Sequence, residues 1–519
     1  MSHKHVSRRK FVSTVAAAAG GALLPSRSLA GLLQDPTLDS PQRGHSSAEH
    51  VAWKALPFPL RHVRLLPGVF KTVSDRNLEY LKSLPEDRLM HTFRLTAGMN
   101  SAAQPLGGWE APDCELRGHF AGGHYLSACA ISYASTGDEE IRRRGDSLVS
   151  ELAKCQQRNG YLSAFPLELF DRLRDRVKVW APFYTIHKIM AGLLDMHQLA
   201  GNAQALDVLE KMADWVDSYT GPLPYEHMQR VLNTEYGGMG EVLANLYAVT
   251  GKAHYIGAAK RFDKKVFFDP LAEHRDELRG LHANTHIPQV IAAARLYEVT
   301  GETRYRDIAQ YFWDEIQQER MYANGGTSNG EVWRSDPGKL SHELGPSSTE
   351  DCCAYNLLKL TRHLFGWNPE PRYTDYYERA LLNHRLGTID PETGTSMYYY
   401  PQGIRLFKTY ATPTDSFWCC NGTGVEEFGK FADTIYFHDE HAVYVNLFIA
   451  SELDWPEKCL KLRQETDFPR QQGTKLIVAS KRPSDVEIRV RIPYWTKGGD
   501  VKVNGRALPV FANPSSYLV

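Results

Sequence analysis

The sequence predicts an α+β multidomain protein in which an (α/α)6 barrel is followed by a β-sandwich. Two observations lead to this prediction. Between about residues 125 and 370, apolar helical segments recur at intervals of about 50 to 65 residues, and nearly all are followed by a glycine. After residue 440 the pattern changes to short alternating or β-branched runs. The 519 residues would suffice for about three ordinary domains, but the repeats join most of them into one helical domain.

The repeated unit predicts a pair of antiparallel helices. In four copies an apolar stretch is followed by a glycine (at 137, 201, 251 and 301) and then by a polar amphipathic stretch. The glycine supplies the left-handed residue that commonly ends a helix. A fifth copy is expected at 357–367 and a weaker first copy at 75–98. Five or six pairs could stack as an open solenoid or close into a ring, and the long connections favour a closed barrel with a loop-built cleft.

The C-terminal part predicts strands. Five short runs have the strand pattern: 443–449, 460–462, 475–478, 486–492 and 501–503. Asn504-Gly505 lies between strand-like runs, which is a strong hairpin signal. We therefore assign residues 56–438 to the barrel and 439–519 to the sandwich. The sequence stops within a strand-like run, so we expect this sandwich to be partial.

Composition narrows the class of function. The chain has 60 Lys and Arg against 61 Asp and Glu, so it lacks the basic excess typical of nucleic-acid binding. No apolar run approaches the ~20 residues that span a bilayer. The 26 Tyr, 21 Phe and 10 Trp suit a sugar-binding cleft as well as ordinary helix packing. The composition therefore indicates a globular protein and excludes a nucleic-acid partner and a membrane span.

The N-terminus predicts a targeting segment. Arg8-Arg9 precedes the apolar stretch 11–24, and Ser28-Leu29-Ala30 has the small-residue pattern of a cleavage site. This arrangement is typical of a twin-arginine signal peptide over residues 1–30, with residues 31–55 as a linker. We expect export of the folded protein to the periplasm or the cell exterior.

Cysteine usage is the most informative feature of the sequence. Four of the eight cysteines form two adjacent pairs, Cys352-Cys353 and Cys419-Cys420. In an exported protein disulfides between the pairs are one interpretation, and buried free thiols are another. A third is a metal site, because Glu350 with three of these thiols would satisfy tetrahedral zinc. Export of an already folded protein favours the metal, since the site can form in the reducing cytoplasm.

Two further groups are candidates for chemistry. Glu331 ends the Gly-, Ser- and Asn-rich loop 325–330, where a carboxylate can serve as a general acid, although most loop glutamates are merely solvated. His187 lies near a predicted helix start, and His282 and His286 are four residues apart on one face. That spacing suits zinc, but the Glu of the His-Glu-x-x-His pattern is missing. Hydrogen bonding to substrate hydroxyls and a purely structural role both stay open for these histidines.

The motifs together resemble a known family. The run EDCCAYNLLKLTRHLF at 350–365, with SFWCCNGTG at 416–424, is similar to glycoside hydrolase family 127, the β-L-arabinofuranosidase family, and to its close relative family 146. The loop 325–331 and the segments 280–284 and 117–119 resemble other signatures of that family. The resemblance extends from about residue 60 to the end. It implies an (α/α)6 barrel followed by β-sandwich modules, in agreement with the repeats.

The resemblance also implies site residues and a reaction. By motif position the zinc ligands are Glu350, Cys352, Cys419 and Cys420, the nucleophile is Cys419, the acid/base is Glu331, and the sugar contacts are His187, His286 and Tyr398. The implied reaction releases β-linked L-arabinofuranose from plant-type glycans or glycoproteins, with retention, through a thioglycosyl intermediate. Cys353 has no ligand role in this scheme and could compete for zinc or oxidise.

Two alternatives from other classes stay open. An (α/α)6-barrel polysaccharide lyase or sugar epimerase would use His, Tyr or Arg and would need no thiolate. A non-catalytic carbohydrate-binding protein with a structural zinc would bind sugar without turnover. All three interpretations share an oligosaccharide or polysaccharide as the partner, and none fixes the oligomeric state.

Overall fold

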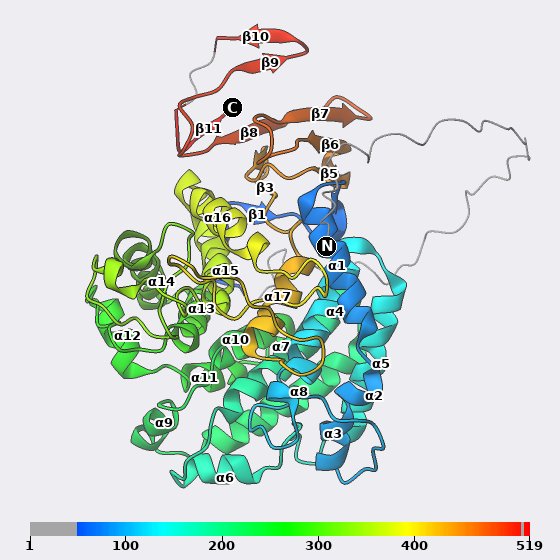
Figure 1. Cartoon of the computed structure of the whole chain (residues 1–519), viewed down its shortest axis with the longest axis vertical. Coiled ribbons are helices and arrows are strands. Elements are labelled where there is room, and N and C mark those ends of the chain that lie inside the picture. The colour runs from blue at the N-terminus through cyan, green and yellow to red at the C-terminus, as the bar shows by residue number, and fades with distance from the viewer. Residues whose placement is uncertain (1–48, 510–512) are drawn as a thin grey trace, which may run out of the picture. The chain divides into compact units, whose positions relative to one another are not determined.

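Six inner helices form a closed ring in the computed structural model of the chain, which describes residues 49–509 and 513–519 (Figure 1). They are α4 (Tyr125–Thr136), α7 (Pro182–Ala200), α10 (Met239–Thr250), α13 (Ala283–Thr300), α15 (Asp351–Trp367) and α17 (Cys419–Gly429). Each helix packs on the next, and α17 packs back on α4. The predicted (α/α)6 barrel is therefore confirmed, and the open solenoid is excluded.

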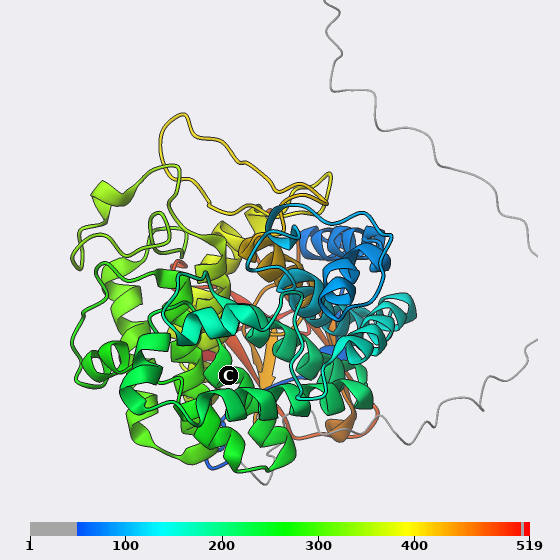
Figure 2. The ribbon, with the colours of Figure 1, turned by 90° about the horizontal axis from the view of Figure 1, so that it is seen from below.

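An outer layer of helices covers the ring. Its members are α5 (Glu139–Cys155), α8 (Ala203–Thr220), α11 (His254–Lys260), α14 (Thr303–Glu315), α16 (Pro371–Asn383) and α1 (Val69–Ser83). Short helices occupy the connections: α2 (Glu86–Leu89), α3 (His91–Thr96), α6 (Glu168–Arg174), α9 (Tyr225–Val231) and α12 (Lys265–Ala272). Figure 2 shows the helices from below, in front of the strands.

The glycine repeat has the predicted structural meaning in four of its copies. Each inner helix from α4 to α13 ends at a glycine with a φ between 71° and 75°, a left-handed conformation that favours glycine. Polar caps then start two of the outer helices: Asp138 accepts from the backbone of α5, and Asn202 from that of α8.

The other two predicted copies differ from the plan. Helix α15 occupies the fifth position, but it ends at Asn368 with extended backbone and has no left-handed glycine. The expected first copy at 75–98 is wrong, because these residues fall in α1, α2 and α3 and form no inner–outer pair. The sixth pair instead joins α17 with α1, which lies more than 300 residues earlier in the chain.

Strands gather at one end of the helical barrel (Figure 1). One sheet has the order β1 (Leu56–Pro57), β3 (Tyr436–His438), β4 (Ala442–Val445), β8 (Glu487–Ile492), β11 (Ser516–Leu518). The second has the order β2 (Val63–Leu65), β5 (Ser451–Trp455), β6 (Leu460–Glu465), β7 (Lys475–Ser480), and β9 (Val501–Val503) pairs with β10 (Arg506–Leu508). All pairs are antiparallel except β4–β8. Asn504 and Gly505 both have positive φ, as the predicted hairpin turn requires.

The strands are attached to the barrel at several points. β1 and β2 precede the first helix, yet they pair with β3 and β5 from the C-terminal part. Arg491 on β8 is fully buried and forms ion pairs with Asp375, at 2.6 Å, and with Glu378, both on α16. Because a buried charge needs such partners, this cluster ties the second domain to an outer helix.

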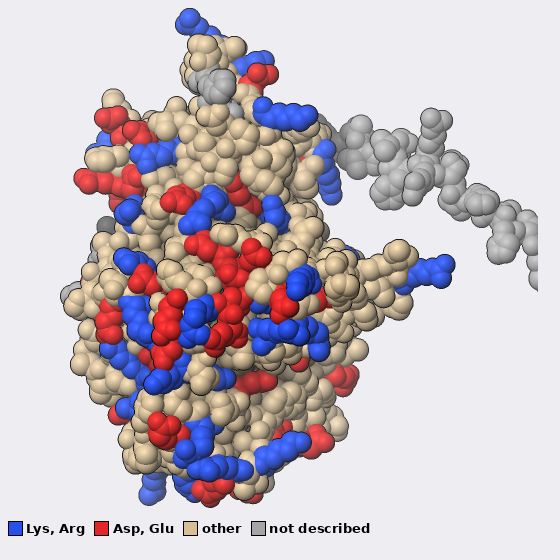
Figure 3. Space-filling model, turned by 90° about the vertical axis from the view of Figure 1, so that its left-hand side faces the viewer, with Lys and Arg blue, Asp and Glu red and all other residues tan. Residues whose placement is uncertain are grey.

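The sequence also predicts the absence of a membrane span and the presence of an N-terminal targeting segment. No helix among the described residues is long and apolar enough to cross a bilayer. On the face shown in Figure 3, basic and acidic side chains are interspersed. The twin-arginine signal at residues 1–30 lies outside the described residues, and so does most of the linker at 31–55. Both assignments stay predictions.

Candidate active site

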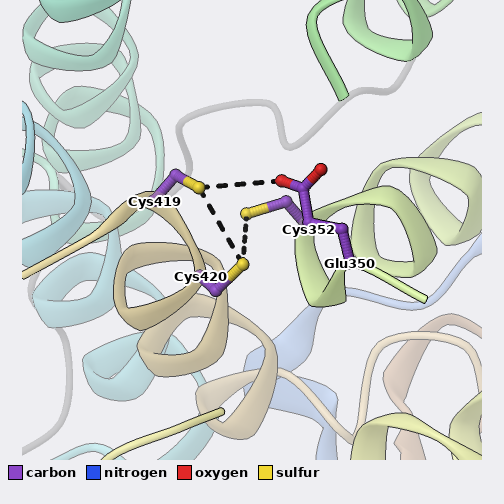
Figure 4. A group of neighbouring side chains, drawn as sticks. All are labelled: Glu350, Cys352, Cys419 and Cys420. Atoms are coloured by element: carbon purple, nitrogen blue, oxygen red, sulfur yellow. Dashed lines mark hydrogen bonds between the residues drawn. The ribbon is translucent and has the colours of Figure 1, made fainter. Parts of the chain in front are cut away.

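Two inner helices bring four metal-binding side chains together at their N-terminal ends. Glu350 is the residue before α15 and Cys352 lies in its first turn, while Cys419 and Cys420 are the first two residues of α17. The two helices pack side by side, so the donors converge although they are nearly 70 residues apart in the chain (Figure 4). Helix N-termini carry partial positive charge, which favours thiolates and carboxylates at this place.

The distances among these donors match a tetrahedral site. All four ligand atoms lie within 4.8 Å of one another. The Sγ atoms of Cys352 and Cys420 are 3.2 Å apart, those of Cys419 and Cys420 are 3.8 Å apart, and Cys419 Sγ is 3.7 Å from Glu350 Oε1. Zn–S bonds of about 2.3 Å in a tetrahedron give sulfur–sulfur edges of about 3.8 Å. The donor set therefore fits zinc in both chemistry and size.

Burial makes the charged forms of these donors unfavourable in the absence of a cation. It raises the pKa of the Cys419 and Cys420 thiols and of the Glu350 carboxyl, because none of these groups is charged easily away from water. For Cys352 burial acts in the same direction, but hydrogen bonds from the neighbouring thiols outweigh it and lower the pKa. A bound divalent ion would replace the protons and stabilise all four anionic donors.

The structure argues against disulfide bonds between the two cysteine pairs. All eight cysteines are free, and the closest pair of sulfurs, at 3.2 Å, is well beyond the ~2.05 Å of a disulfide bond. Cys353 lies outside the group of four donors but contacts one of them. Its Sγ lies 3.6 Å from Glu350 Oε2 and 3.9 Å from Ser328 Oγ. It therefore contacts the outer oxygen of the Glu350 carboxylate and does not belong to the ligand set.

Glu331 lies in the same pocket as the thiol cluster. Tyr398 donates its hydroxyl to Glu331 Oε1, and His282 Nε2 lies 3.6 Å from Oε2 and 3.5 Å from an oxygen of Glu235. The contact with His282 lowers the pKa of Glu331, and burial opposes this effect only in part. Glu331 has a φ of 67°, an uncommon value for a residue with a side chain and one often found at functional sites.

Backbone hydrogen bonds hold the loop 325–331, which carries Glu331 and is called the acid loop below, against residues 347–351, which carry Glu350. Thr349 N donates to Ser328 O at 3.0 Å, and Gly330 N donates to Ser347 O at 2.9 Å. Asp351 N donates to Tyr398 O at 2.9 Å, and the Cys420 thiol lies 3.4 Å from the same carbonyl oxygen. Tyr398 thus contacts both the carboxylate and the thiol cluster, and its segment fixes their relative position.

The three predicted sugar-contacting residues lie in different surroundings. His187 and Tyr398 line the pocket, and His187 Nδ1 has no hydrogen-bond partner among the described residues. Burial lowers the pKa of His187, so its ring is neutral and can donate to or accept from a hydroxyl. His286 does not line the pocket: it packs on Phe267, and its Nδ1 contacts His282 O at 2.7 Å. His282, the other member of that pair, faces the pocket.

Sequence reasoning missed several pocket residues. Trp109 and Trp180 meet edge to face with their ring centroids 5.0 Å apart, which provides an aromatic surface for a sugar. Polar residues complete the wall: Lys188, Glu235, Glu241, Asn284, Thr285, Asn356, Lys359 and Thr423. All except Glu235 lie on the inner helices, but several have polar neighbours in the sequence, so no local pattern marks them as pocket residues. Trp109 lies in a connection with no pattern that marks it.

The fold and the site together define a class of protein. The (α/α)6 barrel has a pocket in which a carboxylate, a buried thiol cluster and paired tryptophans meet, as the family that the sequence motifs resemble would require. The family models for the β-L-arabinofuranosidase GH127 catalytic domain and middle domain match residues 62–433 and 442–519. The chain therefore belongs to glycoside hydrolase family 127.

Similar proteins agree with this assignment. The non-reducing end β-L-arabinofuranosidase of Bifidobacterium longum subsp. longum is 24% identical over 444 residues, which are 74% of this chain and 65% of that relative. A solved GH127 β-arabinofuranosidase has a TM-score of 0.70 at 18% identity, covering 90% of this chain and 78% of the other. The GH127 β-L-arabinofuranosidase of Geobacillus stearothermophilus T6 has a TM-score of 0.68 at 19% identity, covering 88% and 79%. The solved structures support the fold.

Proposed function

We propose that this protein is a retaining glycoside hydrolase that releases β-linked L-arabinofuranose from plant-type glycans or glycoproteins. One observation carries the proposal: the Glu350–Cys352–Cys419–Cys420 cluster shares a pocket with Glu331, so a thiol and an acid can act on one glycosidic bond. Family membership supports the furanoside as the substrate. The usual pair of carboxylates would be replaced by one carboxylate and one thiolate.

Glu350, Cys352, Cys419 and Cys420 would hold zinc. The metal supplies one property when bound, which is to keep its cysteine ligands deprotonated at neutral pH. Among the three sulfur ligands, Cys419 is the one with access to the substrate. Cys419 and Cys352 both line the pocket, but Cys419 is 5% exposed, whereas Cys352 and Cys420 are 0% exposed. We therefore assign Cys419 as the nucleophile.

The reaction would proceed in two displacements. Cys419 Sγ forms a bond to the anomeric carbon while the bond to the leaving oxygen breaks, and Glu331 gives its proton to that oxygen. Glu331, now a carboxylate, takes a proton from water as the water oxygen bonds to the same carbon and the carbon–sulfur bond breaks. Each displacement inverts the carbon, so the configuration is retained overall.

The contacts of Glu331 favour one of its two roles and set a pH limit on the other. His282 and Tyr398 stabilise the carboxylate, which is the form needed to activate water in the second step. The first step needs the protonated form. Because the pKa of Glu331 is lowered, we expect activity to fall on the alkaline side at a lower pH than an unperturbed carboxyl would give.

The test is a panel of p-nitrophenyl glycosides with the wild type, Cys419→Ser and Glu331→Gln. We expect turnover of the β-L-arabinofuranoside by the wild type, a loss on the order of a thousandfold or more in Cys419→Ser, and about one zinc per chain. Glu331→Gln should accumulate an adduct of one pentosyl group on Cys419, visible by mass spectrometry, because p-nitrophenolate leaves without an acid while deglycosylation lacks its base.

Other outcomes would support other functions. Undiminished activity in Cys419→Ser would exclude the thiolate mechanism and favour a lyase or an epimerase. Sugar binding without turnover of any glycoside would indicate a carbohydrate-binding protein, and a zinc content far below one per chain would reject the metal site.

A further inference from the structure

One cation in the pocket has no acidic partner. Lys188 lies on α7 beside His187, one helical turn after Tyr184, and lines the pocket. Its Nζ is 5.7 Å from the centre of the Tyr184 ring. Within residues 49–509 and 513–519 it forms no hydrogen bond and no ion pair. The backbone and Cβ of Lys188 lie against Gly123, and the residue lines the pocket.

Glu426 and Glu241 attract Lys188 electrostatically, but both carboxylates bind other residues directly. Glu426 binds His124 Nδ1 at 2.5 Å with one oxygen and the Tyr355 hydroxyl with the other. Glu241 lies 2.9 Å from Nζ of Lys359, the other lysine of the pocket. The two lysines therefore differ: Lys359 is neutralised by a neighbouring carboxylate, and Lys188 keeps three N–H donors that no protein group accepts.

An ammonium group in such a position needs acceptors from the ligand. Lysine can only donate, and burying a charge without partners is costly. A furanose ring offers hydroxyl oxygens at close spacing, and the neutral His187 ring beside Lys188 can bind a second hydroxyl. A charged donor also discriminates strongly, because a sugar that lacks the hydroxyl leaves the ammonium unpaired.

We propose that Lys188 is a specificity-determining residue that donates a hydrogen bond to one hydroxyl of the sugar held in the pocket. The inference rests on the proposed glycosidase function and deepens it. It predicts that this lysine, and not Lys359, makes the enzyme depend on one particular hydroxyl of the arabinofuranosyl group.

The experiment combines substitutions of the lysines with substrates that each lack one hydroxyl. The substrates are p-nitrophenyl β-L-arabinofuranoside and its three monodeoxy analogues, and the proteins are the wild type, Lys188→Met and Lys359→Met. For the wild type we expect kcat/KM to fall roughly 10- to 100-fold for one analogue. In Lys188→Met we expect kcat/KM for the parent substrate to fall by a similar factor. The further loss of kcat/KM caused by removing that one hydroxyl should disappear.

Lys359→Met is the matched control, since it removes the lysine that already has a carboxylate partner. It should lower thermal stability and leave the ratio between the parent and each analogue as in the wild type. Should Lys188→Met fail to fold, Lys188→Ala supplies the same comparison, because alanine also has no side-chain donor.

Each result decides the proposal. Unchanged deoxy penalties in the Lys188 variants, at any level of activity, would overturn the role of Lys188 while leaving the proposed function intact. A wild type that cleaves no arabinofuranoside would overturn the proposed function, and this inference with it.

Discussion

The barrel has a regular part and a closing part, and they contribute differently to the site. The regular part is the four hairpins from α4 to α14, in which each inner helix ends at a left-handed glycine. The closing part comprises α15, α16 and α17, with α1 from the other end of the chain. Its connections 316–350 and 384–418 contain no α-helix. The thiols, the acid loop and Tyr398 all belong to the closing part, so the reactive groups lie where the repeat breaks.

The two parts also use glycine for different purposes. In the regular part glycine follows the helix and supplies a backbone conformation. In α17 it lies inside the helix and supplies space: a Cβ at Gly422 would be 2.0 Å from Cδ2 of the His124 ring, and one at Gly424 would be 2.7 Å from Ser396 Oγ. The helix that carries Cys419 therefore packs against His124, which directly precedes α4, and against Ser396 only because these positions lack side chains.

The largest expected effect tests this difference directly. Gly422→Ala places a methyl group within the buried His124 ring, and we expect it to destabilise the fold by about 3 kcal/mol or more and to reduce the zinc content. Gly251→Ala is the matched change in the regular part. Nothing lies within 4 Å of its added Cβ, so the only destabilisation comes from alanine in a left-handed backbone conformation, at about 1 kcal/mol. Urea unfolding measures the stability of the two variants, and metal analysis measures their zinc content. Equal losses of stability in the two variants would contradict the different uses of glycine in the two parts.

The same difference explains what the sequence could predict of the fold. The hairpins were predictable because Gly137 and its three counterparts mark helix ends at a regular spacing. Helix α17 was not, because its three glycines lower helix propensity and leave no clear apolar period. Its pairing with α1 is a contact between distant segments, and local patterns carry no information about it.

Only part of the site could be predicted from the sequence. Vicinal cysteines near an acid are rare and chemically specific, so the ligand cluster could be proposed from residue types alone. Lys188 and Trp109 could not, because an isolated lysine on a helix or a tryptophan in a loop becomes informative only when the fold brings it to the pocket. His286 shows the reverse case: its spacing from His282 was suggestive, yet it lies outside the pocket.

An intermediate effect concerns Cys353, the extra thiol of the closing part. Its contact with Glu350 Oε2 leaves Oε1 directed at Cys419, as a group that orients a ligand should do. We expect Cys353→Ala to weaken zinc binding roughly tenfold and Cys353→Ser to retain most of the affinity, because the hydroxyl can still donate. Competition with a chromophoric chelator measures this. Unchanged or tighter binding in Cys353→Ala would instead support Cys353 as a competitor for the metal.

The smallest expected effect tests how the regular part acts on the chemistry. His282 caps α13 and contacts Glu331, so it belongs to the regular part but tunes an acid of the closing part. His282→Asn keeps a helix-capping acceptor and removes the imidazole. Without that contact the pKa of Glu331 should rise. Because the first displacement needs protonated Glu331, the alkaline limb of kcat/KM should move to higher pH, by roughly 0.5 to 1 pH unit.

The position of this limb, and not the height of the profile, is the readout, since losing a pocket residue also lowers activity. His286→Asn is the matched control, because it changes the same residue type one turn further along α13, outside the pocket, and should leave the limb in place. A limb that stays fixed or moves to lower pH in His282→Asn would show that the contact at 3.6 Å does not control the proton on Glu331. In that case the regular part would serve only as the wall of the pocket, and the hydrogen bond from Tyr398 would be the contact that sets the pKa of the acid.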